Sequence, residues 1–396
     1  MPVNNTEELL LATRMGDTGR LTELLESGAD PNVLNNIGLT ALIVATKCNR
    51  VEVIAILLAN GADPNIQGSK GGTALVLAGF YGSVEVVRLL LANGANPNME
   101  DTYGRTALIV ASVRGHLETV HMLLHNGGNQ NVQNKYGDSA LMEVAKCGRV
   151  EVINVLLANG ADPNLQNNKG WTALTYATWT ASTETTRLLL AHGADPNIQR
   201  NDGGTALIVA VKCNYVEVIH LLLANRPDLN IRNNDGDTAL IVAVKSNRAE
   251  IIDLLLDNGA GPNLQNNNGD TALHDAARKG RTEVTRMLLA KRADPNVQNN
   301  DGDTALIWAA ESGDADAVNL LLNNRADPDV KDKQGRTALT RAAQKGHNAV
   351  VNTLLHAHTE HFNHYSIIPR TLVGDNAVDT MMENEDDELR KRRDKE

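Results

Sequence analysis

The sequence predicts an all-α repeat solenoid, a curved, elongated stack of short helix-turn-helix units with turn-rich fingers between them. Three observations predict it. The tripeptide Thr-Ala-Leu (once Ser-Ala-Leu) recurs ten times at intervals of 33 residues, without insertion. A Leu-Leu pair closes every copy, and the segment Gly-Ala-Asp-Pro-Asn or a variant of it separates the copies. Such constant spacing is expected when each unit stacks on an equivalent neighbour.

The first residue of the tripeptide, called the marker here, predicts the start of a first helix. A Ser or Thr side chain can accept a hydrogen bond from a free amide of the first helical turn. Nine positions later stands Gly or Asn in nine of the ten copies, and these residues tolerate the left-handed conformation that ends helices. The markers are Thr40, Thr73, Thr106, Ser139, Thr172, Thr205, Thr238, Thr271, Thr304 and Thr337.

A second helix is expected in each unit, opening near an acid such as Glu52 and closing at the Leu-Leu pair. An acidic residue suits the positive end of the helix dipole. Gly usually follows the helix, but Arg226, Arg292 and Arg325 replace it in three copies. A side chain in the left-handed conformation costs about 1 kcal/mol, so we expect softer junctions at these three places.

Between units, a Gly stands two residues before every marker, and in four copies it directly follows Asp or Asn. This is the turn chemistry of a tight hairpin, and it predicts β-hairpin or turn-like fingers. One unit alone cannot bury its Leu pair, whereas stacked units cover one another and form a continuous core.

The combination of Gly-x-Thr-Ala-Leu, Leu-Leu-x-x-Gly-Ala-Asp-Pro-Asn and the 33-residue period resembles the ankyrin-repeat family over residues 6–358. A tetratricopeptide array has a 34-residue period and lacks the Gly-Ala-Asp-x-Asn loop. The sequence departs from the family in having Ala after every marker, where the family has Pro. The histidine of the family's Thr-Pro-Leu-His motif survives only as His274. Its loss elsewhere puts in doubt the polar contacts that it provides between neighbouring repeats.

Three regions follow from this pattern. Residues 5–34 form a degenerate, more polar first repeat that we expect to cap the stack. Ten repeats of 33 residues occupy 35–358. Residues 359–396 have no repeat register and end in blocks of opposite charge, so we expect this tail to be disordered or a solvated helix.

Composition excludes several classes of function. The net charge of −11 argues against general nucleic-acid binding. No apolar run is long enough for a membrane span, and no secretory signal opens the sequence. We therefore expect a cytoplasmic, monomeric protein without cofactors or a small-molecule substrate. The basic run 390–395 would allow nuclear import, although acidic residues just before it partly neutralise it.

Candidate chemical sites are few. His274 and Asp275 could be a catalytic dyad, but the ankyrin resemblance makes His274 structural, and no triad, phosphate loop or metalloprotease motif accompanies them. Cys48, Cys147 and Cys213 lie at least two units apart, too far to pair, and are interpreted as small apolar residues. His356, His358, His361 and His364 could bind zinc or copper if the last helix continues. The alternative is a His-rich polar cap.

Aromatic residues give the main candidate for a binding site. Ankyrin proteins often hold partners with the finger tips and the inward side of the first helix, here positions −4, −3, −1, +7 and +8 from the marker. Seven of the eleven aromatic residues lie between 80 and 179, and six of them occupy these positions. Aromatic and Arg side chains are common hot spots of protein interfaces. The alternative is that they only fill gaps between repeats, as Tyr176 does in this interpretation. The candidates are Phe80, Tyr81, Tyr103, Arg105, Arg114, Tyr136, Trp171 and Trp179.

The later fingers carry acids. Asp235 and Asp301 stand at −3, where turn chemistry alone could explain them, and Asp237, Asp270 and Asp303 stand at −1, where it does not. We expect an acidic strip for a basic partner segment. The sequence thus predicts a non-enzymatic scaffold or adaptor that binds a protein partner along the concave face. The alternative is the substrate-recruiting subunit of a larger assembly such as a ubiquitin ligase, docked through the tail.

Overall fold

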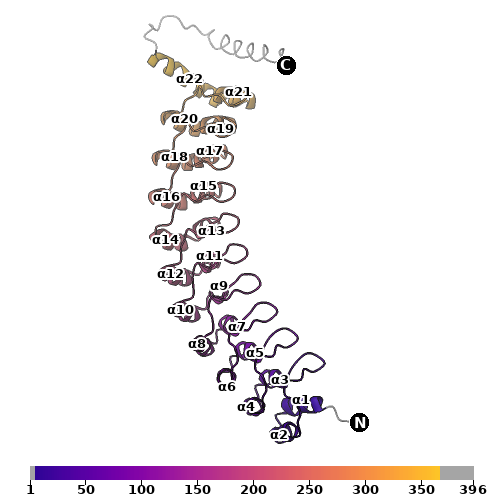
Figure 1. Ribbon diagram of the computed structural model, residues 1–396. Coiled ribbons are helices and arrows are strands. Elements are labelled where there is room, and N and C mark those ends of the chain that lie inside the picture. Colours follow the sequence, from indigo (N-terminus) through magenta and orange to yellow (C-terminus); the bar gives the residue numbers. More distant parts are fainter. Residues whose placement is uncertain (1–4, 366–396) are drawn as a thin grey trace. The chain divides into compact units, whose positions relative to one another are not determined.

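The computed structural model describes residues 5–365, and the chain divides into two compact units between Ala272 and Leu273. The first unit holds α1 to α16 and the second α17 to α22 (Figure 1). The helices are α1 (Asn5–Met15), α2 (Thr18–Glu26), α3 (Ala41–Lys47), α4 (Val51–Ala59), α5 (Ala74–Tyr81), α6 (Val84–Ala92), α7 (Ala107–Arg114), α8 (Leu117–His125), α9 (Ala140–Cys147), α10 (Val150–Ala158), α11 (Ala173–Trp179), α12 (Thr183–Ala191), α13 (Ala206–Cys213), α14 (Val216–Ala224), α15 (Ala239–Lys245), α16 (Ala249–Asp257), α17 (Ala272–Arg278), α18 (Thr282–Ala290), α19 (Ala305–Ser312), α20 (Ala315–Asn323), α21 (Ala338–Lys345) and α22 (Asn348–Tyr365).

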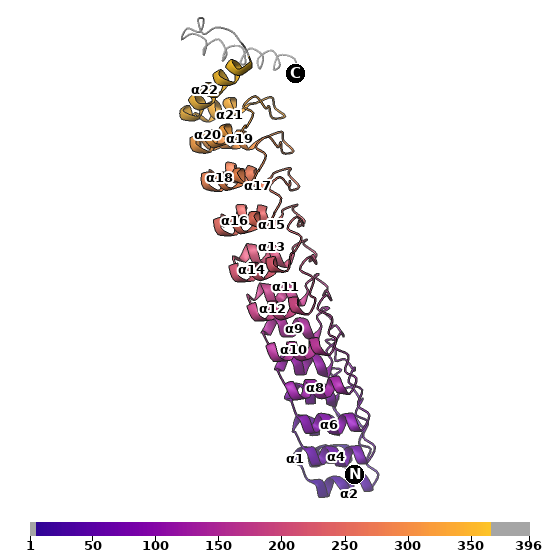
Figure 2. The same cartoon turned by 90° about the vertical axis from the view of Figure 1, so that its left-hand side faces the viewer.

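Each unit is built from two rows of helices. First helices contact first helices of neighbouring repeats, as α5 contacts α7, and second helices contact second helices, as α6 contacts α8. The finger loops project beyond the row of first helices in both views (Figures 1 and 2). The all-α solenoid expected from the sequence is therefore confirmed.

The helix boundaries follow from the marker chemistry. In nine repeats the hydroxyl of the marker accepts from the amide three residues later at 3.2–3.4 Å. These markers are Thr40, Thr73, Thr106, Ser139, Thr172, Thr205, Thr238, Thr304 and Thr337. The residue at +9 is left-handed, including Ala181 with φ 55°, the one copy without Gly or Asn. Arg226, Arg292 and Arg325 are also left-handed, with φ of 50°, 64° and 67°. The softness expected at these junctions stays a prediction.

The core lies between the two helix rows. The first leucine of each closing pair is 0% exposed in every repeat, which explains why that position never varies. These residues are Leu57, Leu90, Leu123, Leu156, Leu189, Leu222, Leu255, Leu288, Leu321 and Leu354. Burying a Leu side chain contributes about 1.5–3 kcal/mol, so this column contributes substantially to the packing of each repeat.

Of the two forms that the sequence predicted for the fingers, β-hairpin or turn, the structure has turns. Among residues 5–365, their only strand-like pairing is an isolated bridge between Gln133 and Ser139. An Asn or Asp at −5 folds the loop instead: Asn134 Oδ1 accepts from the amides of Tyr136 at 2.9 Å and Asp138 at 3.1 Å. Gly137 has φ 80°, and a Cβ there would lie 2.6 Å from the backbone nitrogen of the next finger. The conserved spacing of glycine thus reflects both the turn and the close approach of adjacent fingers.

Asparagine side chains connect the repeats. In the Asp-Pro-Asn loop, Asn65 Nδ2 donates to the carbonyl of Gly94 at 3.0 Å, and its Oδ1 accepts from the amide of Asn96 at 2.7 Å. Asn32 and Asn164 make the same pair of bonds to their next loops. This asparagine ladder supplies polar contacts between repeats at the loops, separate from the contact that a histidine such as His274 makes.

The last helix, α22, continues to Tyr365, beyond the boundary at 358 that the repeat pattern predicts. The part of the tail from 366 to 396, including the basic run 390–395, lies outside the described residues. Within residues 5–365, no helix combines the length and apolar character that crossing a membrane requires.

Candidate functional site

The candidate site is the finger face, defined here as the finger loops together with the solvent-exposed side of the first helices. Large apolar side chains that are exposed in the described part of the chain all lie between residues 11 and 179, and most of them stand on this face. They are Leu11, Met15, Val33, Leu34, Ile37, Tyr81, Tyr103, Leu117, Tyr136 and Trp179. Sequence reasoning missed Leu11, Met15, Leu34 and Ile37 because it counted only aromatic residues.

The first aromatic group belongs to α5 and α7. Phe80 and Tyr81 meet edge to face, with ring centroids 5.2 Å apart. Arg114, from the next repeat, lies over the Phe80 ring with its guanidinium carbon 3.9 Å from the centroid. Phe80 is half-buried, whereas Tyr81 is 45% exposed. The pair therefore forms an apolar surface bordered by a cation.

The second group lies on two neighbouring fingers. Lys135 Nζ is 4.0 Å from the centroid of the Tyr103 ring and 5.0 Å from that of Tyr136. Arg105 also lies over Tyr103, at 4.9 Å, but it is bound to Asp101 at 2.7 Å. Tyr103 is 44% and Tyr136 58% exposed. Two exposed rings and two cations thus stand side by side across adjacent repeats.

The third group surrounds Trp171. Its ring stacks on Tyr176 at 4.8 Å and meets Trp179 edge to face at 6.1 Å. Arg200 from the following finger lies over Trp171 at 4.5 Å and is itself bound to Asp202. Trp179 is 55% exposed and Trp171 is half-buried. The structure therefore brings Tyr176, which the sequence analysis treated as a gap filler, into the same cluster as the two tryptophans.

A buried polar network supports this cluster. Asp138 is 4% exposed, and its carboxylate accepts from Lys146 at 2.6 Å, from Asn167 at 2.7 Å and from the Tyr176 hydroxyl at 3.2 Å. Burial lowers the pKa of Lys146, but the hydrogen bond to Asp138 and the charges of Glu143 and Asp138 outweigh it, so that the pKa is raised. Burial and the charge of Asp138 raise the pKa of Tyr176. The network fixes the ring on which Trp171 stacks.

The acids expected at the finger tips divide into two sets. Asp235 and Asp301 are exposed at −3, as expected. Asp237, Asp270 and Asp303 are instead buried, at 5%, 3% and 2% exposure, which corrects the expectation that they line the surface. The residue at −1 points back toward the first helix: Asp237 accepts from Lys245 at 2.7 Å and from Asn266 of the next repeat at 3.0 Å. Asp237 thus links neighbouring repeats, and because all three carboxylates are buried, none of them is presented to a partner.

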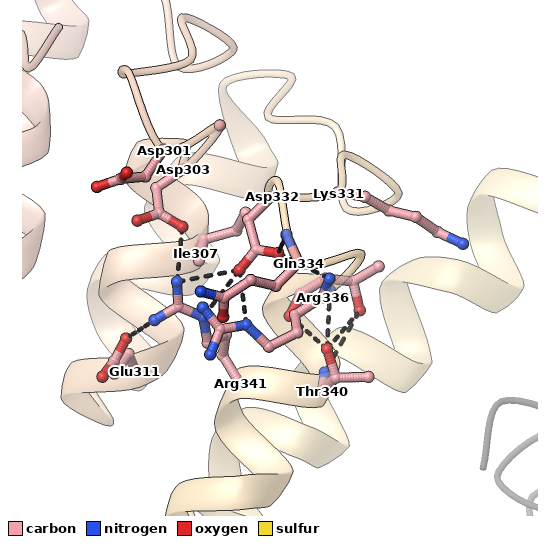
Figure 3. A network of polar contacts seen from close by, with 12 residues as sticks. Asp301, Asp303, Ile307, Glu311, Lys331, Asp332, Gln334, Arg336, Thr340 and Arg341 are labelled. Atoms are coloured by element: carbon pink, nitrogen blue, oxygen red, sulfur yellow. Dashed lines mark hydrogen bonds and ion pairs between the residues drawn. The ribbon is translucent and has the colours of Figure 1, made fainter. Parts of the chain in front are cut away.

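In the second unit, Asp303 belongs to a network around Arg341 (Figure 3). The guanidinium donates to Asp303 at 2.7 Å, to Asp332 at 3.0 Å and to Glu311. Burial raises the pKa of Asp303, and although Arg341 opposes this, the charge of Asp332 adds to it and the pKa stays raised. Burial also acts to raise the pKa of Asp332, but its bonds to Arg336 and Arg341 lower it overall. Of these carboxylates, Asp332 also binds Arg336 and has a lowered pKa, whereas Asp303 has a raised one.

The remaining candidates give no sign of a chemical site. His274 is 1% exposed and donates from Nε2 to the carbonyl of Asp303 at 3.0 Å, the structural role expected from the ankyrin resemblance. Cys48, Cys147 and Cys213 are free thiols, the last two exposed at helix ends. The side chains of His358, His361 and His364 lie outside the described residues. In the described part, no group of three His, Cys, Asp or Glu side chains is placed to hold a metal ion.

The stacked helix pairs, the capped first helices and the Asn-linked loops define a helical repeat protein with a finger face. Its sequence matches the family model of ankyrin repeats, in three-copy blocks, over residues 9–101, 56–134, 80–167, 141–233, 207–299 and 288–365. The chain belongs to the ankyrin-repeat family. A comparison with curated proteins gave no match. Ankyrin repeats generally mediate protein–protein interaction, and their fold is typically a non-enzymatic interaction module.

Proposed function

We propose that the protein is a non-enzymatic scaffold or adaptor that binds a partner protein on its finger face between residues 11 and 179. The observation that carries the proposal is the confinement of the exposed large apolar side chains to this stretch. Contiguous exposed apolar surface on a folded protein marks an interaction site, and Tyr, Trp and Arg are the residue types that dominate binding energy.

The experiment replaces the four most exposed aromatic residues by serine: Tyr81, Tyr103, Tyr136 and Trp179. Proximity cross-linking with mass spectrometry then compares partners of the variant with those of the wild type. We expect partners to be lost while the free energy of unfolding changes by less than about 0.5 kcal/mol per site, since exposed substitutions cost little. Leu117→Ser, an exposed position on the second-helix row, is the matched control. A total loss of several kcal/mol would mean that these rings are core and would contradict the proposal.

Only two of the five acidic positions remain part of the proposed binding site. Asp235 and Asp301 are exposed and are assigned to partner selection, while the buried Asp237, Asp270 and Asp303 are not. We also propose that the protein is monomeric and cytoplasmic. The basic run 390–395 would allow its import into the nucleus. Recruitment to a larger assembly such as a ubiquitin ligase rests on residues 359–396, most of which lie outside the described residues. Deleting them tests it, because a scaffold keeps its partner whereas a recruiter loses its assembly.

A further inference from the structure

We infer that the finger face between residues 70 and 136 recognises an extended acidic peptide segment of the partner, an inference that rests on the proposed function. This face carries few unpaired carboxylates. Of the four carboxylates that its fingers and first helices carry between 66 and 149, three are already ion-paired. Asp101 binds Arg105, and Asp138 and Glu143 bind Lys146. Glu100 is the fourth.

Arg114 and Lys135 differ from those cations. Both are exposed, both lie over aromatic rings of the preceding repeat, and among the described residues no carboxylate stands within ion-pair distance of either. Lys70, at the tip of an earlier finger, is exposed and has no ion pair in the same part of the structure. This face thus has three cations without a counter-ion and one such acid, Glu100, although the net charge of the protein is −11. The face is locally positive, and a partner of complementary charge is acidic.

The repeat geometry sets the form of the ligand. Tyr103 and Tyr136 hold the same position, −3, in adjacent repeats, so their spacing is that of neighbouring packed helices, about 8–10 Å. An extended chain rises about 3.3 Å per residue. Three residues of an extended peptide therefore span the distance between neighbouring repeats. If such a peptide runs along the stack, every third residue contacts the next repeat. Acidic residues three apart, with apolar residues between them, fit this face.

A single-stranded nucleic acid is the other polyanion that aromatic rings and cations can bind, but it needs open ring faces on which bases stack. Here the faces of Phe80 and Tyr103 are covered by Arg114 and Lys135. Asp101 and Glu100 would also repel a continuous phosphate backbone. The arrangement favours discrete carboxylates over a phosphate chain.

The test selects displayed 12-residue random peptides on the wild-type protein and on Arg114→Glu/Lys135→Glu. The matched control, Lys212→Glu/Lys333→Glu, changes the net charge equally at exposed cations outside residues 70–136. We expect wild type and control to enrich Asp and Glu at three-residue spacing, and the charge-reversed variant to enrich Lys and Arg. A fluorescent copy of the best acidic peptide should bind the charge-reversed variant on the order of tenfold more weakly, since exposed ion pairs contribute modestly each.

The outcomes separate the inference from the function on which it rests. Peptides that need Tyr81, Tyr103, Tyr136 and Trp179 but carry no acidic bias overturn the inference and leave the proposed function standing. Peptides that bind the serine variant of these residues as well as the wild type contradict both. Binding of a fluorescent 20-residue oligothymidylate that is lost in the charge-reversed variant would assign the face to nucleic acid and overturn the inference as well.

Discussion

His116 donates from Nε2 to the carbonyl oxygen of Phe80, 3.1 Å away, and its ring packs against Gly82 at the end of the same helix, α5. His347 repeats this arrangement with the carbonyl of Glu311 and with Gly313. A histidine ten residues after the marker thus connects two repeats, a contact that differs from the one made by His274.

Replacing Gly82 by Ala should be more costly than replacing Gly148. Both residues are left-handed, which costs a Cβ about 1–2 kcal/mol. A Cβ at Gly82 would also lie 2.5 Å from the His116 ring, whereas nothing stands within 4 Å of one at Gly148. We expect a loss of about 2–4 kcal/mol for Gly82→Ala, measured by urea unfolding, because overpacking adds to the strain. Adding His116→Ala should recover the overpacking part, and equal losses at both glycines would contradict the prediction.

Three buried threonines should be replaceable by valine with a gain in stability. The hydroxyls of Thr119, Thr186 and Thr285 are fully buried in second helices and have no hydrogen-bond partner in the described structure. Each Thr→Val removes a desolvated polar atom at nearly constant shape and should stabilise by about 1 kcal/mol.

Thr185 provides the control for these threonines, since its hydroxyl accepts from Ser182 at 2.8 Å. Thr185→Val should therefore give a smaller gain or a loss when all four variants are compared by thermal unfolding. Destabilisation by all four substitutions would show that the threonine hydroxyls are satisfied in solution.

Arg341→Met should destabilise the second unit by about 3–5 kcal/mol, because it leaves the carboxylates of Asp303 and Asp332 buried together. The loss should shrink as the pH falls from 7 toward 4 and these groups become protonated. In the wild type, the lowered pKa of Asp332 stabilises above pH 3.8, and this contribution is lost as the pH falls through its folded pKa. Urea unfolding at several pH values checks both trends. Arg286→Met, at an exposed ion pair, should cost less than about 0.5 kcal/mol.

Alkaline pH should weaken the Asp138 network. The raised pKa of Lys146 means that its stabilisation is complete below pH 10.5 and is lost as the pH rises through the folded pKa. The raised pKa of Tyr176 acts in the same direction above pH 10.0, because the fold favours the neutral phenol. Unfolding from pH 8 to 11.5 should therefore show a steeper loss in the wild type than in Lys146→Met/Tyr176→Phe. The exposed pair Lys212→Met/Tyr81→Phe should leave the slope nearly as it is.

The repeat architecture was predictable because its signals, the Thr caps, the left-handed position at +9 and the Leu pair, recur every 33 residues. The direction of the side chain at −1 was not predictable, since it depends on partners further away in the chain. Asp138 and Asp237 each bind a lysine eight residues later and an asparagine in the next repeat. That Asp–Lys spacing was visible in the sequence and could have indicated burial. The inter-repeat contacts of Asn65 were missed because only histidine was considered for that role.

The asparagine ladder has a consequence for how such a chain can change length. Asn98 meets the next loop through a glycine carbonyl and a backbone amide, Gly127 O and Asn129 N, and Asn164 meets Gly193 O and Asp195 N in the same way. Because the acceptor and the donor are backbone groups, any copy offers them whatever its side chains. Gain or loss of a whole 33-residue copy within the first unit would therefore leave the asparagine ladder matched, so copy number can change without breaking these bonds.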